Sequence, residues 1–391
     1  MKIFALALLM GLGVAYAAPY TPASDAEVVE RLPGRASDPA IRRVDSLRKQ
    51  LSARPEDIPL RLEIARRYFD LAMAQGDPRY VGYASSALAP LATSAAGDAD
   101  YWLVRGLIQQ YSHQFEAALA SLAKAGQLNP ASPEPLSWRS AIYMVQARYP
   151  EALAECGRLT PLADPLLGAG CSAYVQAATG QLQQAFESLT KTAGSAANTS
   201  PEMLLWLNTR LAEMAVRLQR NDAAEGHFRN ALKQGVTDQF LLGAYADFLL
   251  ARDRPAEVLT LLAGWERSDI LLLRLALAGR AAKDTRAAGW ATQLRERFDA
   301  AALRGDSLHE QEAARFELDI ENQPAKALDL ASRNYQDQKE PRDAEVLMRA
   351  ALAAKQPRAA VPALDWLRNS KYEDPALKAL ADKLSTPGAG R

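Results

Sequence analysis

The chain has few of the side chains that carry most protein chemistry. Its 391 residues include three histidines and two cysteines, and only 7% are aromatic. It also has no excess of either charge, because lysine plus arginine and aspartate plus glutamate number 46 each. A protein that neutralises many phosphates is basic, so this balance argues against general nucleic-acid binding.

The histidines lack the neighbours that a metal site needs. His309-Glu310 begins like a zinc-protease motif, but Ala313 stands where the second histidine is required. His113 and His227 have no histidine, cysteine or carboxylate at ligand spacing. The sequence therefore predicts no metal ion and no cofactor.

Motifs of common catalytic sites are missing as well. There is no glycine-rich phosphate loop after a strand and no Gly-x-Ser-x-Gly sequence. The carboxylates between Glu310 and Glu321 spread over several faces of the helix expected there, as they do on a solvated surface. We predict no catalytic residues.

The first seventeen residues have the pattern of a secretory signal peptide. Lys2 precedes an apolar stretch over residues 3–14, and residues 15–17 (Ala-Tyr-Ala) form a small-x-small cleavage site. That stretch is short for a membrane span, and no later run approaches the roughly 18 apolar residues that a spanning helix needs. We expect a mature chain that starts at Ala18 and is exported to the periplasm of a Gram-negative bacterium.

What the chain has in abundance is alanine at a regular spacing. Nine alanines each follow a turn signal and open an apolar run of helical period; these markers are Ala84, Ala118, Ala152, Ala185, Ala224, Ala256, Ala288, Ala327 and Ala360. They recur every 32 to 39 residues. A period of about 34 is the length of one helix–turn–helix unit, so the sequence predicts an all-α solenoid.

A second set of positions follows the same period. Twelve residues before each marker lie Ala72, Gly106, Ser140, Ala173, Ala212, Ala244, Ala276, Arg315 and Met348, of which the first seven are small. In residues 99–132, the large and small residues Trp102, Gly106, Ala118, Leu122, Ala125 and Pro130 resemble the tetratricopeptide repeat (TPR) family. The resemblance covers about residues 57–370 and weakens beyond Ala263, where Arg295, Arg315, Asn334 and Met348 break the pattern. It implies a right-handed superhelix of nine stacked hairpins.

These patterns divide the chain into six segments. They are a signal peptide (1–17), a flexible lead (18–36), an N-terminal capping helix (37–56), regular repeats (57–264), degenerate repeats (265–370), and a C-terminal capping helix with a disordered tail (371–391).

The two cysteines fall in neighbouring units. Cys156 lies in the second helix of one unit and Cys171 in the first helix of the next, at equal distances from the bend between them. In an oxidising compartment they can form a disulfide; the alternative is a pair of buried thiols that pack as small apolar side chains.

In the family that the chain resembles, the first helix of each hairpin lines a concave groove. Counting from the marker alanines places there Leu103, Leu107, Tyr111, Met144, Tyr174, Trp206, Glu213, Arg217, Leu241, Tyr245, Phe248, Leu277 and Arg280. Because this set is mostly aromatic and aliphatic, the predicted ligand is an apolar or amphipathic segment of another protein. The alternative is that a tight superhelix buries these residues itself.

The sequence therefore predicts an exported, non-enzymatic protein-interaction scaffold of a periplasmic or envelope complex. One alternative is a regulatory activator or lid of an envelope enzyme or transporter. Another is a cell-wall-acting enzyme on a helical-repeat scaffold, which would need a carboxylate with a perturbed pKa in a cleft.

Overall fold

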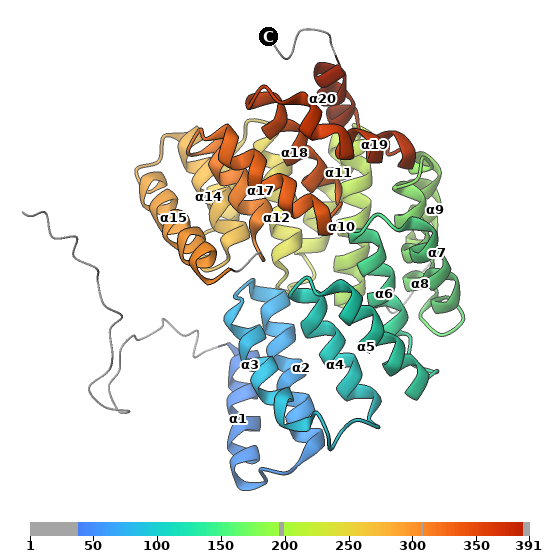
Figure 1. Ribbon diagram of the computed structural model, residues 1–391. Coiled ribbons are helices and arrows are strands. Elements are labelled where there is room, and N and C mark those ends of the chain that lie inside the picture. Colours follow the sequence, from blue (N-terminus) through green and yellow to red (C-terminus); the bar gives the residue numbers. More distant parts are fainter. Residues whose placement is uncertain (1–37, 195–198, 306–307, 386–391) are drawn as a thin grey trace, which may run out of the picture.

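The computed structural model describes residues 38–194, 199–305 and 308–385 (Figure 1). Within these ranges the chain forms twenty α-helices, two short 3-10 helices and no strand, which confirms the predicted all-α solenoid. None of these helices is long and apolar enough to cross a membrane. The predicted signal peptide, flexible lead and C-terminal tail lie outside the described residues.

Nine antiparallel helical hairpins follow one another along the chain. After α1 (Pro39–Ala53), the first five are α2 (Ile58–Gln75) with α3 (Arg79–Leu88), α4 (Ala99–Tyr111) with α5 (Phe115–Leu128), α6 (Glu134–Val145) with α7 (Tyr149–Leu159), α8 (Pro165–Ala177) with α9 (Leu182–Gly194), and α10 (Pro201–Arg217) with α11 (Asn221–Leu232). The last four are α12 (Gln239–Leu250) with α13 (Pro255–Leu261), α14 (Asp269–Ala282) with α15 (Ala287–Arg304), α16 (Glu310–Asp319) with α17 (Pro324–Asp337), and α18 (Pro341–Ala353) with α19 (Val361–Ser370). The 3-10 helices η1 (Ala89–Leu91) and η2 (Pro357–Ala360) lie beside α3 and α19, and α20 (Pro375–Ser385) follows the last hairpin.

All nine hairpins turn through one residue in the left-handed backbone region. The residues with positive φ in these turns are Gly76, His113, Ala147, Gly180, Gln219, Asp253, Lys283, Asn322 and Lys355. Such a residue ends a helix by turning the chain away from its axis, and a non-glycine residue there costs about 1–2 kcal/mol. Only two of the nine are glycine, so packing of the two helices outweighs this local cost.

The marker alanines lie mainly where the helices of a hairpin meet. Seven of them are fully buried, as the period predicts. Ala256 and Ala288 are exposed, so for these two the predicted position is wrong. Val258 and Ala287 are buried in their place, because α13 is short and α15 begins at Ala287.

The superhelix is so tightly wound that its last hairpins lie against the third and fourth ones. Trp366 of α19 donates a buried hydrogen bond from Nε1 to the hydroxyl of Tyr149 in α7, over 2.8 Å. The backbone N–H of Lys339 donates to the carbonyl of Val145, over 2.7 Å. One apolar core contains residues from both parts, such as Leu107 and Leu347. The concave side is therefore largely filled by the chain itself.

The first hairpin also contacts a later one. Gly76, in the turn after α2, lies directly against Gln239 and Ser268. A Cβ atom at Gly76 would stand 1.9 Å from Oε1 of Gln239, so a larger residue cannot occupy this position. Here glycine is required by close approach as well as by its positive φ.

Ion pairs connect the inner helices of the last four hairpins. Asp247 of α12 lies 2.6 Å from Arg274 of α14 and 2.8 Å from Arg315 of α16. Asp319, at the end of α16, is 3.6 Å from Arg315 and also pairs with Arg349 of α18. Burial by itself raises the pKa of Asp247, but Arg274 and Arg315 lower it to about 2. We call these five residues the ion ladder.

Candidate protein-binding surface

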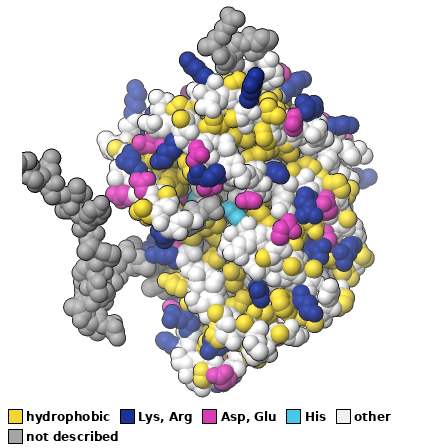
Figure 2. Space-filling model, viewed as in Figure 1, with side chains coloured by type: hydrophobic (Ala, Val, Ile, Leu, Met, Phe, Trp, Pro, Cys, Tyr) yellow, Lys and Arg dark blue, Asp and Glu magenta, His cyan; other side chains and the backbone are white. Residues whose placement is uncertain are grey.

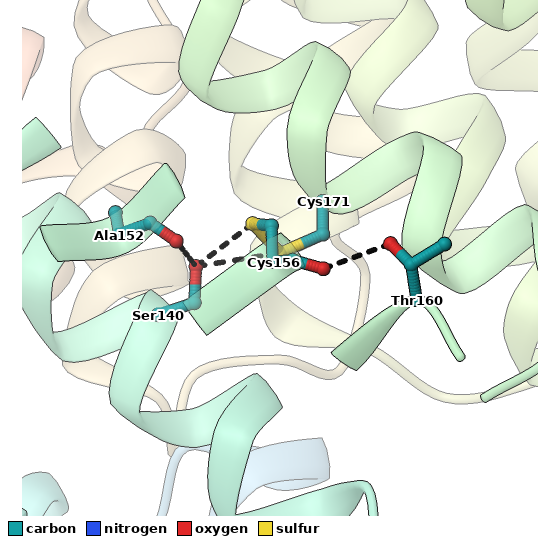
Figure 3. The surroundings of a disulfide bond; sticks show 5 residues. All are labelled: Ser140, Ala152, Cys156, Thr160 and Cys171. Atoms are coloured by element: carbon teal, nitrogen blue, oxygen red, sulfur yellow. Dashed lines mark hydrogen bonds between the residues drawn. A yellow bond between two sulfur atoms is a disulfide. The ribbon is translucent and has the colours of Figure 1, made fainter. Parts of the chain in front are cut away.

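Cys156 and Cys171 form a disulfide that joins α7 to α8 (Figure 3). Their Cα atoms are 5.5 Å apart, which is within the range that a disulfide can span. The hydroxyl of Ser140 lies 3.2 Å from Sγ of Cys156 and 3.4 Å from Sγ of Cys171, and it donates to the carbonyl of Ala152. Neighbouring hairpins are thus covalently linked in the middle of the chain.

Several predicted groove residues lie in the apolar cores. Leu103, Leu107, Leu241, Tyr245 and Phe248 are between 0 and 7% exposed. The prediction that a partner can reach them is therefore wrong. Leu103 and Leu107 share a core with the last hairpins, and Tyr245 and Phe248 stack on Phe228 of the preceding hairpin.

Four other predicted groove residues contact neighbouring parts of the fold. Tyr111, Met144 and Leu277 are half-buried and pack at the edges of the apolar cores. Arg280 is exposed, but its guanidinium donates to the carbonyls at the end of α16 and just beyond it, over 2.7 and 2.9 Å. These four join parts of the fold and present no continuous surface.

The remaining four predicted residues lie together: Tyr174 on α8, and Trp206, Glu213 and Arg217 on α10. Arg210 of α10, which was not predicted, lies among them. Trp206, Arg210, Glu213 and Arg217 repeat at intervals of four, three and four residues, which places them along one face of α10. Arg210 stacks over the ring of Tyr174 in α8, 4.6 Å from its centroid. We call these five residues the α10 stripe.

Arg210 holds the middle of the α10 stripe in place. Its Nη1 lies 2.8 Å from Oε2 of Glu213, and the two side chains are 21% and 36% exposed. Burial by itself lowers the pKa of Arg210, but the charge of Glu213 raises it above the ordinary value of arginine. The stripe therefore offers an ion pair held in place beside the ring of Tyr174, one helical turn from Trp206.

A glycine in α8 makes room for Trp206. A Cβ atom at Gly170 would lie 2.4 Å from the indole ring, so only glycine lets the ring pack flat against α8. Gly170 directly precedes Cys171, and the disulfide therefore anchors the turn of α8 on which Trp206 rests.

The C-terminal end of the α10 stripe is covered by the segment before α20. Nε of Arg217 donates to the carbonyl of Glu373 over 2.9 Å, and its guanidinium lies 3.7 Å from the centre of the Tyr372 ring. The carboxylate of Glu373 also accepts from the backbone N–H of Leu182, at the start of α9. Arg217 is thus occupied, whereas Trp206, Arg210 and Glu213 stay partly exposed.

Burial raises the pKa of three carboxylates among the described residues, Asp238, Asp343 and Glu345, and none of them lines the 580 Å³ cavity beside α1 or the 420 Å³ cavity beside α17. Asp343 has a structural role. Burial raises the pKa of Asp343 well above its usual range. One of its oxygens accepts from Nδ2 of Asn334 over 3.1 Å, and the other accepts from the backbone N–H of Glu340 over 2.9 Å, as part of the cap of α18.

The described residues hold no group of three or more histidines, cysteines or carboxylates placed to bind a metal ion. His113 instead accepts a hydrogen bond at Nδ1 from the side chain of Gln338, over 3.0 Å. On the face drawn in Figure 2, basic and acidic side chains are interspersed, in keeping with a net charge of zero.

No protein-family model matches the chain, and neither does any curated protein sequence. Among solved structures, it is similar to the Cut9–Hcn1 hetero-tetramer of the APC/C, with a TM-score of 0.41 and 13% identity over 89% of this chain and 53% of that one. It is also similar to yeast Tom70, with a TM-score of 0.41 and 13% identity over 88% and 85% of the two chains. The chain thus spans about half the length of the Cut9–Hcn1 chain that it matches. Its TPR-like fold is evident from its own nine hairpins and does not rest on these likenesses.

Proposed function

We propose that the protein is an exported interaction scaffold that binds an apolar or amphipathic segment of another protein at the α10 stripe. The observation that carries the proposal is that Trp206, Arg210 and Glu213 stay partly exposed on one helix face while much of the inner surface is buried. Tryptophan, tyrosine and arginine contribute most of the binding energy at protein interfaces. Because two packed helices present them, little ordering is needed when a partner binds.

Two features support export to the periplasm as part of the same proposal. Residues 1–17 have the pattern of a signal peptide. The Cys156–Cys171 disulfide suits an oxidising compartment, since such bonds are rare in the cytosol. Cell fractionation with N-terminal sequencing tests this, with a mature chain starting at Ala18 expected in the periplasm. A cytosolic chain that retains residues 1–17 would contradict it.

Affinity capture from envelope extract tests the binding surface. Arg210→Ala with Glu213→Ala removes one ion pair between residues three apart, and we expect it to lose the partners that wild type retains. The matched control, Asp365→Ala with Arg368→Ala, removes an exposed pair of the same spacing on α19 and should retain them. Both variants are first compared with wild type by circular dichroism, so that loss of fold is not read as loss of binding.

The same partners captured by wild type and the Arg210/Glu213 variant would overturn the assignment to the α10 stripe. Tyr245 and Phe248 are unsuitable for this test, because both are buried and their replacement would damage the core.

A further inference from the structure

A cavity at the N-terminal end of the solenoid has three basic residues among the seven that line it. Its volume is 580 Å³, and it lies between the second half of α1 and the first turn of α2. The lining residues are Asp45, Arg48, Lys49, Leu51, Ser52, Pro55 and Arg61, which include three positive charges and one negative charge. Asp45, Arg48, Lys49 and Ser52 share one face of α1, because they are spaced as successive turns of a helix.

The three cations of this cavity have no acidic partners. Among the described residues, no carboxylate lies within ion-pair distance of Arg48, Lys49 or Arg61, although most other arginines of the chain are paired. Nε of Arg61 donates to the carbonyl of Pro55, and the guanidinium of Arg48 lies beside the hydroxyl of Tyr68. In a chain of zero net charge, this is a local excess of unpaired positive charge.

A cluster of three tyrosines begins beside Arg48. Tyr68 lies next to Arg48, and its ring centroid is 5.3 Å from that of Tyr83 and 6.2 Å from that of Tyr80. Tyr83 is 48% exposed, one of the most exposed large hydrophobic side chains of the described residues. Aromatic rings beside arginine are the surface composition that protein interfaces favour.

We propose that this surface, made of Arg48, Lys49, Arg61 and Tyr83, binds an acidic segment of a partner protein. Carboxylates of the segment would pair with the three cations, while an apolar side chain packs on Tyr83, whose ring rests on the buried Tyr68. A protein segment is the proposed occupant because its carboxylates are complementary to the unpaired positive charge of Arg48, Lys49 and Arg61, and its apolar side chains to Tyr83. The surface is separate from the α10 stripe, so the proposal stands without the function proposed above.

Fluorescence anisotropy with a labelled acidic peptide tests the proposal. The probe is three repeats of Glu-Glu-Leu, and the reference peptide carries Gln in place of each Glu. The full mature chain is expected to bind the acidic peptide and not the reference, and to bind it more weakly as salt is raised. Replacing Arg48→Gln, Lys49→Gln and Arg61→Gln together should weaken binding about tenfold, since each exposed charge contact accounts for roughly a factor of two.

A control variant separates the cavity from general charge attraction. Lys124→Gln, Lys233→Gln and Lys378→Gln remove three exposed lysines elsewhere, with the same change in net charge, and should alter binding less than twofold. Equal weakening by both triple variants would overturn the proposal. Absence of binding to the acidic peptide would also overturn it. A protein that fails to bind the peptide but binds phosphatidylglycerol vesicles through the cavity residues would overturn it as well. Equal melting temperatures of the two variants exclude unfolding as the cause.

Discussion

In the first five hairpins, the residue where the two helices cross is small and buried; in the last two it is Arg315 and Met348. The early residues are Ala72, Gly106, Ser140, Ala173 and Ala212. Arg315 belongs to the ion ladder, and Met348 is fully buried in the apolar core. The hairpins continue through both regions, so close approach at a small residue is one way to stack them and ion pairing across inner helices is another.

Asn334 and Arg295, which also break the repeat pattern of small and apolar residues, form polar contacts as well. Nδ2 of Asn334 donates to the carboxylate of Asp343 inside the fold, and Arg295 pairs with Glu321 at the surface. The late repeats thus keep the fold by replacing apolar contacts with polar ones. We therefore expect the stability of the early repeats to depend most on buried side-chain volume, and the stability of the late repeats to depend most on paired charges.

The largest effect is expected from a cavity in the early repeats. Leu122 is fully buried and packs against Gly106, where even a Cβ atom would lie 2.8 Å from the leucine side chain. Leu122→Ala should lower the free energy of unfolding by about 3 kcal/mol, since the packed helices cannot collapse into the space. Urea unfolding followed by circular dichroism measures this. A loss below about 1 kcal/mol would show that the early repeats are not closely packed.

The next effect is expected from the ion ladder. Asp247→Asn leaves Arg274 and Arg315 without their shared carboxylate, and the side chain of Arg274 is only 4% exposed. Because Asp247 is itself 35% exposed, we expect a loss of about 2 kcal/mol, below that of a fully buried pair. Hydrogen exchange should show faster exchange in α12 to α18 than in α4 to α11. As a control, Asp365→Asn breaks an exposed pair and should cost at most about 1 kcal/mol.

A smaller effect is expected from acid at the contact between early and late repeats. Burial lowers the pKa of His113 from 6.5 to about 4, and its neutral ring accepts the hydrogen bond from Gln338. The unfolded chain therefore binds a proton more readily, and stability falls as the pH drops from 6.5 to 4. The melting temperature of wild type should fall as the pH drops across this range, and that of His113→Gln should fall less. An equal fall in both would show that other groups cause the pH dependence.

The smallest effect is expected at the surface of the late repeats. Arg295 and Glu321 pair over 2.7 Å, and the arginine side chain is 46% exposed. Water and salt screen such a pair, so Arg295→Ala should be indistinguishable from wild type in urea unfolding. A clear loss would mean that the late repeats depend on surface charges as well as on the ion ladder.

The number of hairpins could be predicted from the sequence because close helix packing leaves a periodic mark. Local turn preferences are a weaker guide: a left-handed residue is expected at Gly76 and Gly180, but not at Ala147 or Gln219. The register failed at Ala256 and Ala288 because α13 and α15 begin only one residue before these alanines, whereas α5, α7, α9, α11 and α17 begin three residues before theirs. The sequence alone does not distinguish an alanine on the outer side from one inside.

The binding surface could be predicted only in part. Trp206 and Glu213 were found from their place in the first helix of a hairpin, and Arg210, one turn from each of them, could have been found by the same count. Tyr245 and Phe248 were misplaced because they stack on Phe228 of α11 and so lie between neighbouring hairpins, a position that a count along one helix does not distinguish from the groove.

The central claim is that the last hairpins lie on the third and fourth ones and so bury much of the inner surface, while the α10 stripe stays partly exposed. The buried hydrogen bond from Trp366 to Tyr149 joins these parts across 217 residues of sequence. A double-mutant cycle of Tyr149→Phe and Trp366→Phe, measured by urea unfolding, tests it directly. The account predicts a coupling energy of about 1 kcal/mol. Effects that add within about 0.3 kcal/mol would mean that the two residues do not interact and would contradict it.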